Sequence, residues 1–142
     1  MRRRGDRGEV AVEVALLAPV LVAFVMIIVA AGRVQSTGAV IDAAARAGAR
    51  AASLARTPEG AEEAALEAVR STLDESQVRC AVPRDGLVGH DRLDTPSGPL
   101  ETVTVRVSCT VPFGDLMSVD GLPGEKTFTG EFTSVVDLHR GR

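Results

Sequence analysis

Aromatic side chains are scarce in this sequence of 142 residues. It contains no tryptophan and no tyrosine, and phenylalanine occurs only four times, at Phe24, Phe113, Phe128 and Phe132. A core made mainly of valine, leucine and alanine buries less area per side chain than an aromatic one. We therefore expect the part of the chain after residue 32 to be marginally stable on its own, and to gain stability from a cross-link or from packing against partners.

Residues suited to catalysis or metal binding are also few. Nucleophilic catalysis needs a serine or cysteine beside a positioned base, and the only histidines are His90 and His139. Asp85, Asp91 and Asp94 flank His90 and could bind a cation weakly, but their spacing is not that of an EF-hand loop. Phosphate-binding motifs of the GxGxxG or Walker type are absent. We therefore expect a protein that is not an enzyme and that has no cofactor, no metal site and no small-molecule substrate.

The balance of charge differs between the two ends of the chain. Residues 1–8 contain four arginines and one aspartate, which leaves a net charge of +3. Residues 32–142 contain twelve Lys or Arg and sixteen Asp or Glu, which leaves a net charge of −4. A nucleic-acid-binding protein needs a basic face, so nucleic acid is excluded as a partner of this acidic part.

A long apolar run follows the basic tip. Val14–Ala31 is eighteen residues without a charge, and only Glu9 and Glu13 interrupt the apolar sequence just before it. A helix that crosses a bilayer needs roughly 20 apolar residues, whereas the core helix of a soluble protein would show a polar stripe. We predict a transmembrane helix over 9–32. The alternative is a cleaved secretory signal peptide with a cleavage site at Val29–Gly32, although the run is longer than the roughly 7–15 apolar residues usual there.

The flanking charges predict the orientation of this helix. Arginines close to a span are retained in the cytoplasm, so residues 1–8 are expected inside and residues 33–142 outside. Arg33 lies on the far side, but it is one charge against four. The expected organisation is a cytoplasmic leader at 1–8, a transmembrane helix at 9–32 and an extracytoplasmic domain at 33–142, in a single-pass protein of the cell membrane.

Two helices are predicted at the start of this domain. The alanine-rich sequence has no proline from Gly32 to Arg56, so the first helix is expected to continue through it. Ala44, Gly48 and Ala52 recur every four residues and form a stripe of small side chains, which either lets another backbone approach closely or simply covers a small sheet. Thr57, followed by proline and glutamate, predicts the start of a second helix that runs to about Asp74.

The remainder of the chain has the periodicity of strands. Leu100–Pro112 and Lys126–Leu138 alternate between apolar and polar residues, as half-buried antiparallel strands do. Gln77–Val82 is a further short strand candidate, Pro83–Pro99 is expected to be a long turn region, and Phe113–Gly124 is expected to be a connection. The predicted class is α+β, with a long N-terminal helix, a second short helix and a small antiparallel sheet of about three to four strands.

The sequence contains two cysteines, Cys80 and Cys109. Outside the cytoplasm an even pair predicts one disulfide bond, which would close a loop of about thirty residues. A metal site is a weaker alternative, because the two thiols have no CxxC spacing and no clustered histidines. Two free, buried thiols are the main competing interpretation.

Three segments of the chain point to a known family. They are Arg7–Pro19, with the sequence RGEVAVEVALLAP; Asp42–Arg50, with the sequence DAAARAGAR; and the strand Val103–Pro112. Together they resemble the TadE-like (TadE/TadG) pseudopilins of tight-adherence, or Flp, pilus systems. The first is similar to the processed leader and helix start of that family, and the second to its hallmark sequence after the span. The cysteine pair and the ending Val136–Arg140 are similar to variants from high-GC Gram-positive bacteria.

This resemblance implies cleavage by a prepilin peptidase after Gly8, on the cytoplasmic side. Glu9 would become the first residue of the mature chain, a charged residue where major pilins usually have an apolar one, and Glu13 would become the fifth. A carboxylate there can neutralise the free amino terminus of a neighbouring subunit. The alternative is an interfacial carboxylate that the helix N-terminus stabilises without any partner.

The implied role is that of a pilin-like minor component of pilus assembly or of the related secretion system. Its partners would be the membrane, the prepilin peptidase, other pilin or pseudopilin subunits and pilus assembly proteins. The alternative function is an unprocessed, membrane-anchored extracytoplasmic domain that binds a partner at the cell surface. A membrane-anchored hydrolase is disfavoured because the sequence lacks a nucleophile with a base.

Overall fold

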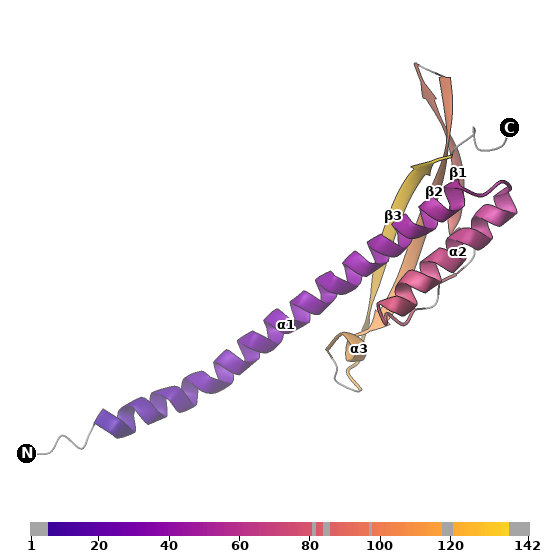
Figure 1. Ribbon diagram of the computed structural model, residues 1–142. Coiled ribbons are helices and arrows are strands. Elements are labelled where there is room, and N and C mark those ends of the chain that lie inside the picture. The colour runs from indigo at the N-terminus through magenta and orange to yellow at the C-terminus, as the bar shows by residue number, and fades with distance from the viewer. Residues whose placement is uncertain (1–5, 81, 84–85, 97, 118–120, 137–142) are drawn as a thin grey trace, which may run out of the picture.

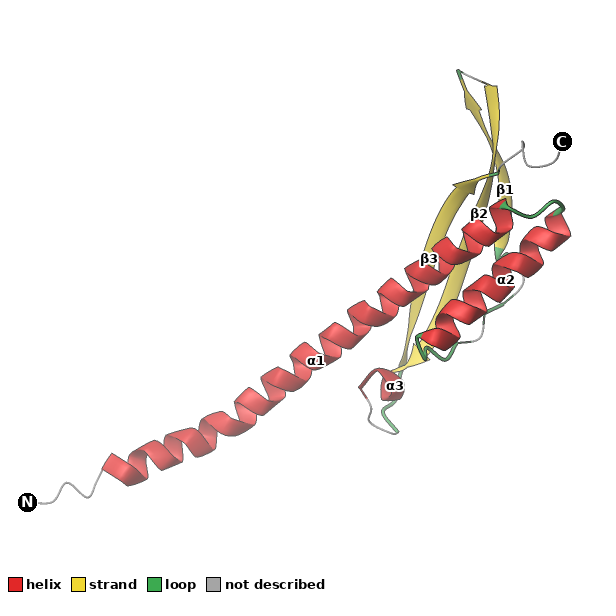
Figure 2. Cartoon of the chain, viewed as in Figure 1, coloured by secondary structure: helices red, strands yellow, loops and turns green. Residues whose placement is uncertain are grey.

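The computed structural model describes residues 6–80, 82–83, 86–96, 98–117 and 121–136. A long helix extends out of a small domain in which two helices lie against a three-stranded antiparallel sheet (Figure 1; Figure 2). The predicted α+β class is confirmed. The elements in chain order are α1 (Asp6–Ser53), α2 (Pro58–Glu75), β1 (Val88–Thr95), β2 (Gly98–Pro112), α3 (Phe113–Met117) and β3 (Glu125–Val135).

Helix α1 is 48 residues long and unbroken, although Pro19 lies inside it. Its N-terminal half projects away from the domain, and its C-terminal half lies beside α2 and across the sheet (Figure 1). The predicted continuation past Gly32 is therefore correct. Because α1 runs through residue 32 without interruption, the expected boundary between span and domain falls inside a helix, and the division at 32/33 stays a prediction.

Helix α2 begins and ends with recognisable capping interactions. The backbone N–H of Gly60 donates a hydrogen bond of 3.1 Å to Thr57 Oγ1, and Pro58 occupies the first turn, as the sequence predicts. At the other end Gln77 adopts a positive φ of 56°. Its N–H donates to the carbonyl of Asp74, and the N–H of Val78 donates to that of Leu73, which is the Schellman pattern.

The sheet has the order β1-β2-β3, with β2 at its centre. From Val103 to Val111 the face of β2 turned toward the helices is buried, and the predicted alternation is confirmed at Val103, Val105, Val107, Cys109 and Val111. The opposite face carries polar pairs that join β2 to β3: Thr104 with Thr133, Arg106 with Glu131, and Thr110 with Thr127. Paired polar groups of this kind suit a sheet with one face in water.

Helix α1 approaches β3 closely at Gly130, which faces the fully buried Ile41. A side-chain Cβ at Gly130 would lie 2.8 Å from the carbonyl oxygen of Ile41, closer than real Cβ atoms come. The absence of a side chain at Gly130 therefore sets the distance between the long helix and the sheet.

Two predictions about strands are wrong. Gln77–Val82 is not a strand: Gln77 lies in the turn after α2, and 78–80 and 82–83 are irregular, because the N–H groups of Gln77 and Val78 cap α2 instead of joining a ladder. The predicted turn region Pro83–Pro99 contains β1, which pairs with β2 from Val88 opposite Val105 to Thr95 opposite Gly98. Strand β1 is exposed along almost its whole length, so it lacks the apolar alternation by which strands are found.

The predicted connection Phe113–Gly124 contains the short helix α3. The N–H of Phe113 donates a 3.0 Å hydrogen bond to the carbonyl of Gly124, which closes the base of this segment. Gly124 has a φ of 108°, and a Cβ there would lie 2.7 Å from the ring of Phe113. The two ends of the segment are thus held together by a hydrogen bond and by ring packing that only glycine permits.

Candidate functional site

The residues expected to be cleaved and to mediate assembly lie in the first turns of α1. Gly8 and Glu9 belong to its helical backbone, and Glu13 follows one turn after Glu9. The side chain of Glu13 is exposed, and no ion-pair partner lies beside it in the part of the chain that the structure describes. The N-terminal end of α1 therefore presents a carboxylate that has no ion-pair partner among the side chains that the structure describes.

The part of α1 that follows Glu13 is apolar and unburied. Its most apolar window of eighteen residues has a mean hydropathy of 3.0, and none of it is buried within the protein. Among the described residues, α1 is the helix that is long and apolar enough to cross a membrane. A core helix of a soluble protein would bury such a surface, so these side chains require an apolar environment outside this chain.

The stripe of small residues on the second half of α1 lies inside the domain. Ala44, Gly48 and Ala52 are all buried. A Cβ at Gly48 would lie 2.8 Å from a methyl group of Val69 on α2 and 3.1 Å from one of Val105 on β2. The close backbone approach expected from this stripe therefore occurs between α1 and α2 of the same chain. The unburied apolar surface of α1 lies in its N-terminal half.

Another side of the same segment carries Arg46, whose guanidinium carbon lies 5.3 Å from the centre of the Phe132 ring. This cation–π contact joins α1 to β3 at the edge of the sheet. The segment DAAARAGAR thus packs on both α2 and β3, and it holds the long helix in a fixed position against the domain.

Cys80 and Cys109 form a disulfide bond. Cys80 lies in the connection after α2, Cys109 is fully buried on β2, and their Cα atoms are 5.5 Å apart. The bond ties an irregular segment to the central strand across 29 positions of sequence. It therefore restrains the connection in which a strand was wrongly expected.

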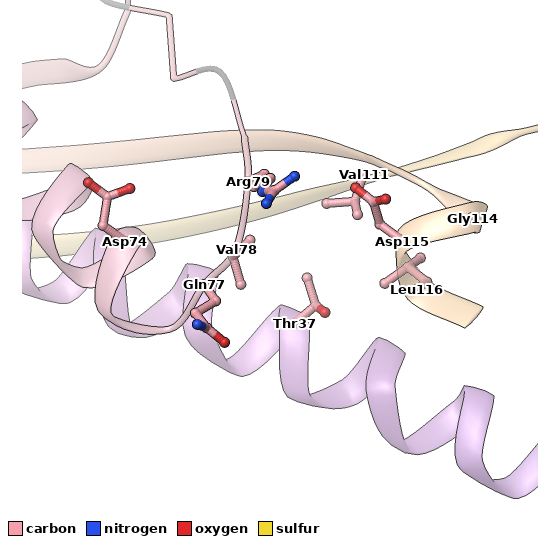
Figure 3. A pocket seen from close by; sticks show the side chains of 9 residues that line it. All are labelled: Thr37, Asp74, Gln77, Val78, Arg79, Val111, Gly114, Asp115 and Leu116. Atoms are coloured by element: carbon pink, nitrogen blue, oxygen red, sulfur yellow. The ribbon is translucent and has the colours of Figure 1, made fainter. Parts of the chain in front are cut away.

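A hollow of about 700 Å³ opens between α1, the end of α2 and α3. Figure 3 shows its lining, which comprises Thr37, Asp74, Gln77, Val78, Arg79, Val111, Gly114, Asp115 and Leu116. The charged members are Asp74, Arg79 and Asp115, and no nucleophile with a neighbouring base is among them. The residues that line the hollow therefore do not form a nucleophile–base pair for covalent catalysis.

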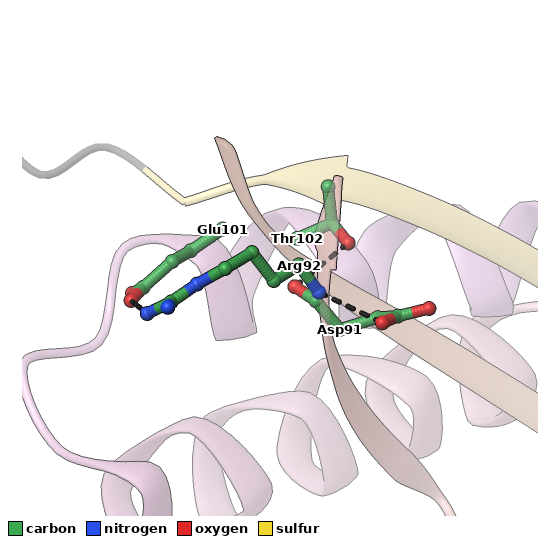
Figure 4. Close-up of polar contacts among 4 residues, drawn as sticks. All are labelled: Asp91, Arg92, Glu101 and Thr102. Carbon is green, nitrogen blue, oxygen red and sulfur yellow. Dashed lines mark hydrogen bonds and ion pairs between the residues drawn. The ribbon is translucent and has the colours of Figure 1, made fainter. Parts of the chain in front are cut away.

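The acidic residues near His90 lie on the β1–β2 hairpin, shown in Figure 4. The backbone N–H of Arg92 donates a 2.8 Å hydrogen bond to Asp91 Oδ1, and its guanidinium pairs with Glu101 at 3.2 Å. Thr102, a polar residue of β2, is buried and donates a 3.2 Å hydrogen bond to the carbonyl of Asp91. His90 and Asp94 lie on the same strand.

Among the described residues no three His, Cys, Asp or Glu side chains gather as metal ligands would. Asp85 and His139 lie outside the described residues. The weak cation site considered around His90 therefore has no support in the part of the chain that the structure describes.

The segment around α3 carries no motif from which the sequence predicts a role. Met117 and Leu122 are exposed there, at 44% and 37% of their surface. In the sequence, these apolar residues lie between glycines in a segment without the periodicity of a strand. That pattern alone does not predict a surface next to α1, because only the fold brings α3 close to α1.

Comparison with known proteins adds one match. Residues 8–50 match the family model described as TadE-like protein. No curated protein and no solved structure matches the chain. The matched residues begin at the expected cleavage position and end with the last arginine of DAAARAGAR, so they coincide with nearly all of α1. The resemblance found from the sequence is confirmed over residues 8–50, the segment with Gly8, Glu9 and Glu13, which are similar to the TadE-like family model.

Proposed function

We propose that this chain is a pilin-like, single-pass membrane protein that acts as a minor component in the assembly of a tight-adherence (Flp) pilus or of the related secretion system. The observation that carries the proposal is the coincidence of two findings on one helix. The TadE-like match covers residues 8–50, and the same helix exposes an apolar surface long enough to cross a bilayer. The family is a structural one, and a non-catalytic role agrees with the lining of the hollow near α3.

The charges predict the topology of the proposed protein. Four arginines precede the apolar run and one, Arg33, follows it, so residues 1–8 remain in the cytoplasm and the domain lies outside. An extracytoplasmic location also suits the disulfide between Cys80 and Cys109, because such bonds persist in oxidising environments. Two independent features therefore support the same orientation.

In this proposal a prepilin peptidase cleaves after Gly8, and Glu13 becomes the fifth residue of the mature chain. Its carboxylate is exposed and no described residue neutralises it. A free amino terminus from a neighbouring subunit would supply the missing positive charge within a bundle of apolar helices. A charge in such surroundings is costly unless it is paired, so the ion pair would specify how far one helix is staggered against the next.

Processing is tested by mass spectrometry of the full chain from cells with and without an active prepilin peptidase. Loss of residues 1–8 only when the peptidase is present is the expected result. An intact N-terminus in both strains would contradict processing and leave an anchored domain. A mature chain that begins near Gly32 would identify a secretory signal peptide and would overturn the membrane-spanning role as well.

Assembly is tested by Glu13→Gln, which removes the charge and keeps the size of the side chain. Glu62→Gln on the exposed face of α2 is the matched control, because it makes the same change outside the span. We expect both variants to enter the membrane at equal levels and only Glu13→Gln to lose recovery in complexes with other pilin subunits. Equal recovery of the two variants would favour a carboxylate stabilised by the helix N-terminus alone.

The second candidate function is an unprocessed domain anchored at the cell surface. It is favoured by Glu9, since cleavage after Gly8 would leave a charged residue at the start of a helix that must enter an apolar bundle. Glu9→Phe separates the two functions. If the native chain is found uncleaved and Glu9→Phe is cleaved, Glu9 blocks processing and the anchored domain is the better description.

A further inference from the structure

Helix α3 lies at the end of the domain nearest to the N-terminal half of α1 (Figure 1). Its buried residue Leu116 lines the hollow together with Thr37 of α1 (Figure 3). Residues Phe113–Met117 and Gly121–Gly124 are together called the α3 segment below. The contact with α1 fixes the height of the α3 segment along the long helix.

The position of the α3 segment along the axis of α1 can be compared with the expected position of the membrane. Thr37 lies four residues after Arg33, the first charge beyond the apolar run, so it is about 6 Å farther along the axis at a rise of about 1.5 Å per residue. The hydrocarbon core of a bilayer is about 30 Å thick and the whole bilayer about 40–45 Å, which leaves roughly 5–7 Å for each headgroup layer. With Arg33 at the edge of the hydrocarbon, the α3 segment stands at the level of the lipid headgroups.

The α3 segment exposes apolar side chains at this level. Met117 is 44% exposed and Leu122 is 37% exposed. The hydrogen bond from Phe113 to Gly124 and the packing of the Phe113 ring on Gly124 hold the two ends of the segment together. A segment whose ends are held together, and which exposes a methionine and a leucine beside a membrane helix, is suited to shallow insertion at the acyl boundary.

We propose that the α3 segment rests on the outer surface of the membrane and inserts Met117 and Leu122 among the lipid headgroups. The domain would then be held at two places, by the span and by this contact, which limits its rotation and tilt relative to the bilayer. The occupant of the apolar surface is lipid because Leu116 and Thr37 line one hollow, which places the α3 segment at the headgroup level beside the proposed span. The inference rests on the proposed membrane-spanning role of α1.

The absence of tryptophan and tyrosine makes the test direct, since one introduced indole is the only strong fluorophore in the chain. Three full-length variants are compared in phosphatidylcholine vesicles whose acyl chains carry bromine either near the carbonyl or near the terminal methyl group. Met117→Trp probes the α3 segment. Leu93→Trp, on the exposed hairpin at the far end of the domain, is the matched control, and Phe24→Trp marks the span.

We expect shallow bromine to quench Met117→Trp several-fold more than Leu93→Trp, with a blue shift of its emission, and deep bromine to quench Phe24→Trp. If Phe24→Trp is quenched and Met117→Trp behaves like Leu93→Trp, the lipid contact is refuted and the span stands. If Phe24→Trp is not quenched, the span and the proposed function both fail. A blue shift of Met117→Trp that grows with protein concentration without bromine quenching would identify a second copy of the chain instead of lipid and overturn the proposal. Leu122→Trp repeats the measurement at a second position in case Met117→Trp does not fold.

Discussion

The contact between α1 and β3 at Gly130 leads to the sharpest prediction about stability. A Cβ at this position would lie 2.8 Å from the carbonyl oxygen of Ile41, 3.0 Å from its carbonyl carbon and 3.1 Å from the backbone nitrogen of Asp42. These are backbone atoms of a helix, so they cannot rotate away as a side chain could. In Gly130→Ala the helix and the strand must therefore move apart.

The size of the effect follows from two opposing contributions. Overpacking a closely packed contact costs about 1–3 kcal/mol. Replacing glycine by alanine within a strand returns roughly 0.5–1 kcal/mol, because glycine loses more conformational entropy on folding. We expect Gly130→Ala to lower the free energy of unfolding by about 1–2 kcal/mol, and the melting temperature by at least about 4 °C for a domain of this size.

Gly89→Ala is the matched control for this prediction. Gly89 also lies in a strand, but its nearest neighbour to a Cβ would be the carbonyl oxygen of Thr104 at an ordinary 3.8 Å. The entropy contribution of replacing glycine by alanine is common to both variants, so the difference between their melting temperatures reports the contact with Ile41 alone. Differential scanning calorimetry of the full chain in one detergent, with the disulfide intact, measures it. Equal melting temperatures for the two variants would refute the claim that the Ile41 backbone limits space at Gly130.

Three further predictions concern the caps and the cross-link. Replacing both Cys80 and Cys109 with alanine should destabilise the domain by about 3–4 kcal/mol, from the closure of a loop of about 29 residues, and peptide mapping without reductant should find the bond in the native chain only. Gln77→Gly should stabilise it by about 0.5–1 kcal/mol, because the positive φ of 56° suits glycine; a lower melting temperature would contradict this. Thr57→Ala should cost about 1 kcal/mol through loss of the hydrogen bond from Gly60, whereas Thr57→Ser should retain most of it.

The parts of the fold that could be predicted from the sequence are those with one buried face. Strand β2 was found because Val103, Val105 and Val107 alternate with polar residues, and that alternation exists since one side of the strand meets the helices. Helix α2 was found from its N-cap at Thr57. Strand β1 was missed because it is exposed along nearly all of its length, so no apolar period marks it.

The roles of Gly8 and Glu13 stay predictions. These two residues and the apolar run lie close together in sequence, so local spacing was enough to relate them. The partner of the small-residue stripe was left open between another subunit and the same chain, because a stripe on one helix does not say which surface covers it. Packing of Gly48 on Val69 and Val105 depends on three elements distant in sequence, and the position of Leu116 in the hollow beside Thr37 of α1 depends on the whole fold.

If α1 crosses the membrane as proposed, its unbroken course makes it a rigid connection between the bilayer and the domain. Since a helix turns by about 100° per residue, inserting one residue between Gly32 and Gly38 would swing the domain about a quarter of a revolution around the membrane normal. Seven inserted residues would bring it nearly back to its original azimuth, but about 10 Å farther from the lipid. Insertions into α1 can therefore change the rotation of the domain about the membrane normal and its distance from the lipid separately. A contact of the α3 segment with lipid would depend on that distance, whereas a contact with one particular neighbouring protein would depend on the rotation.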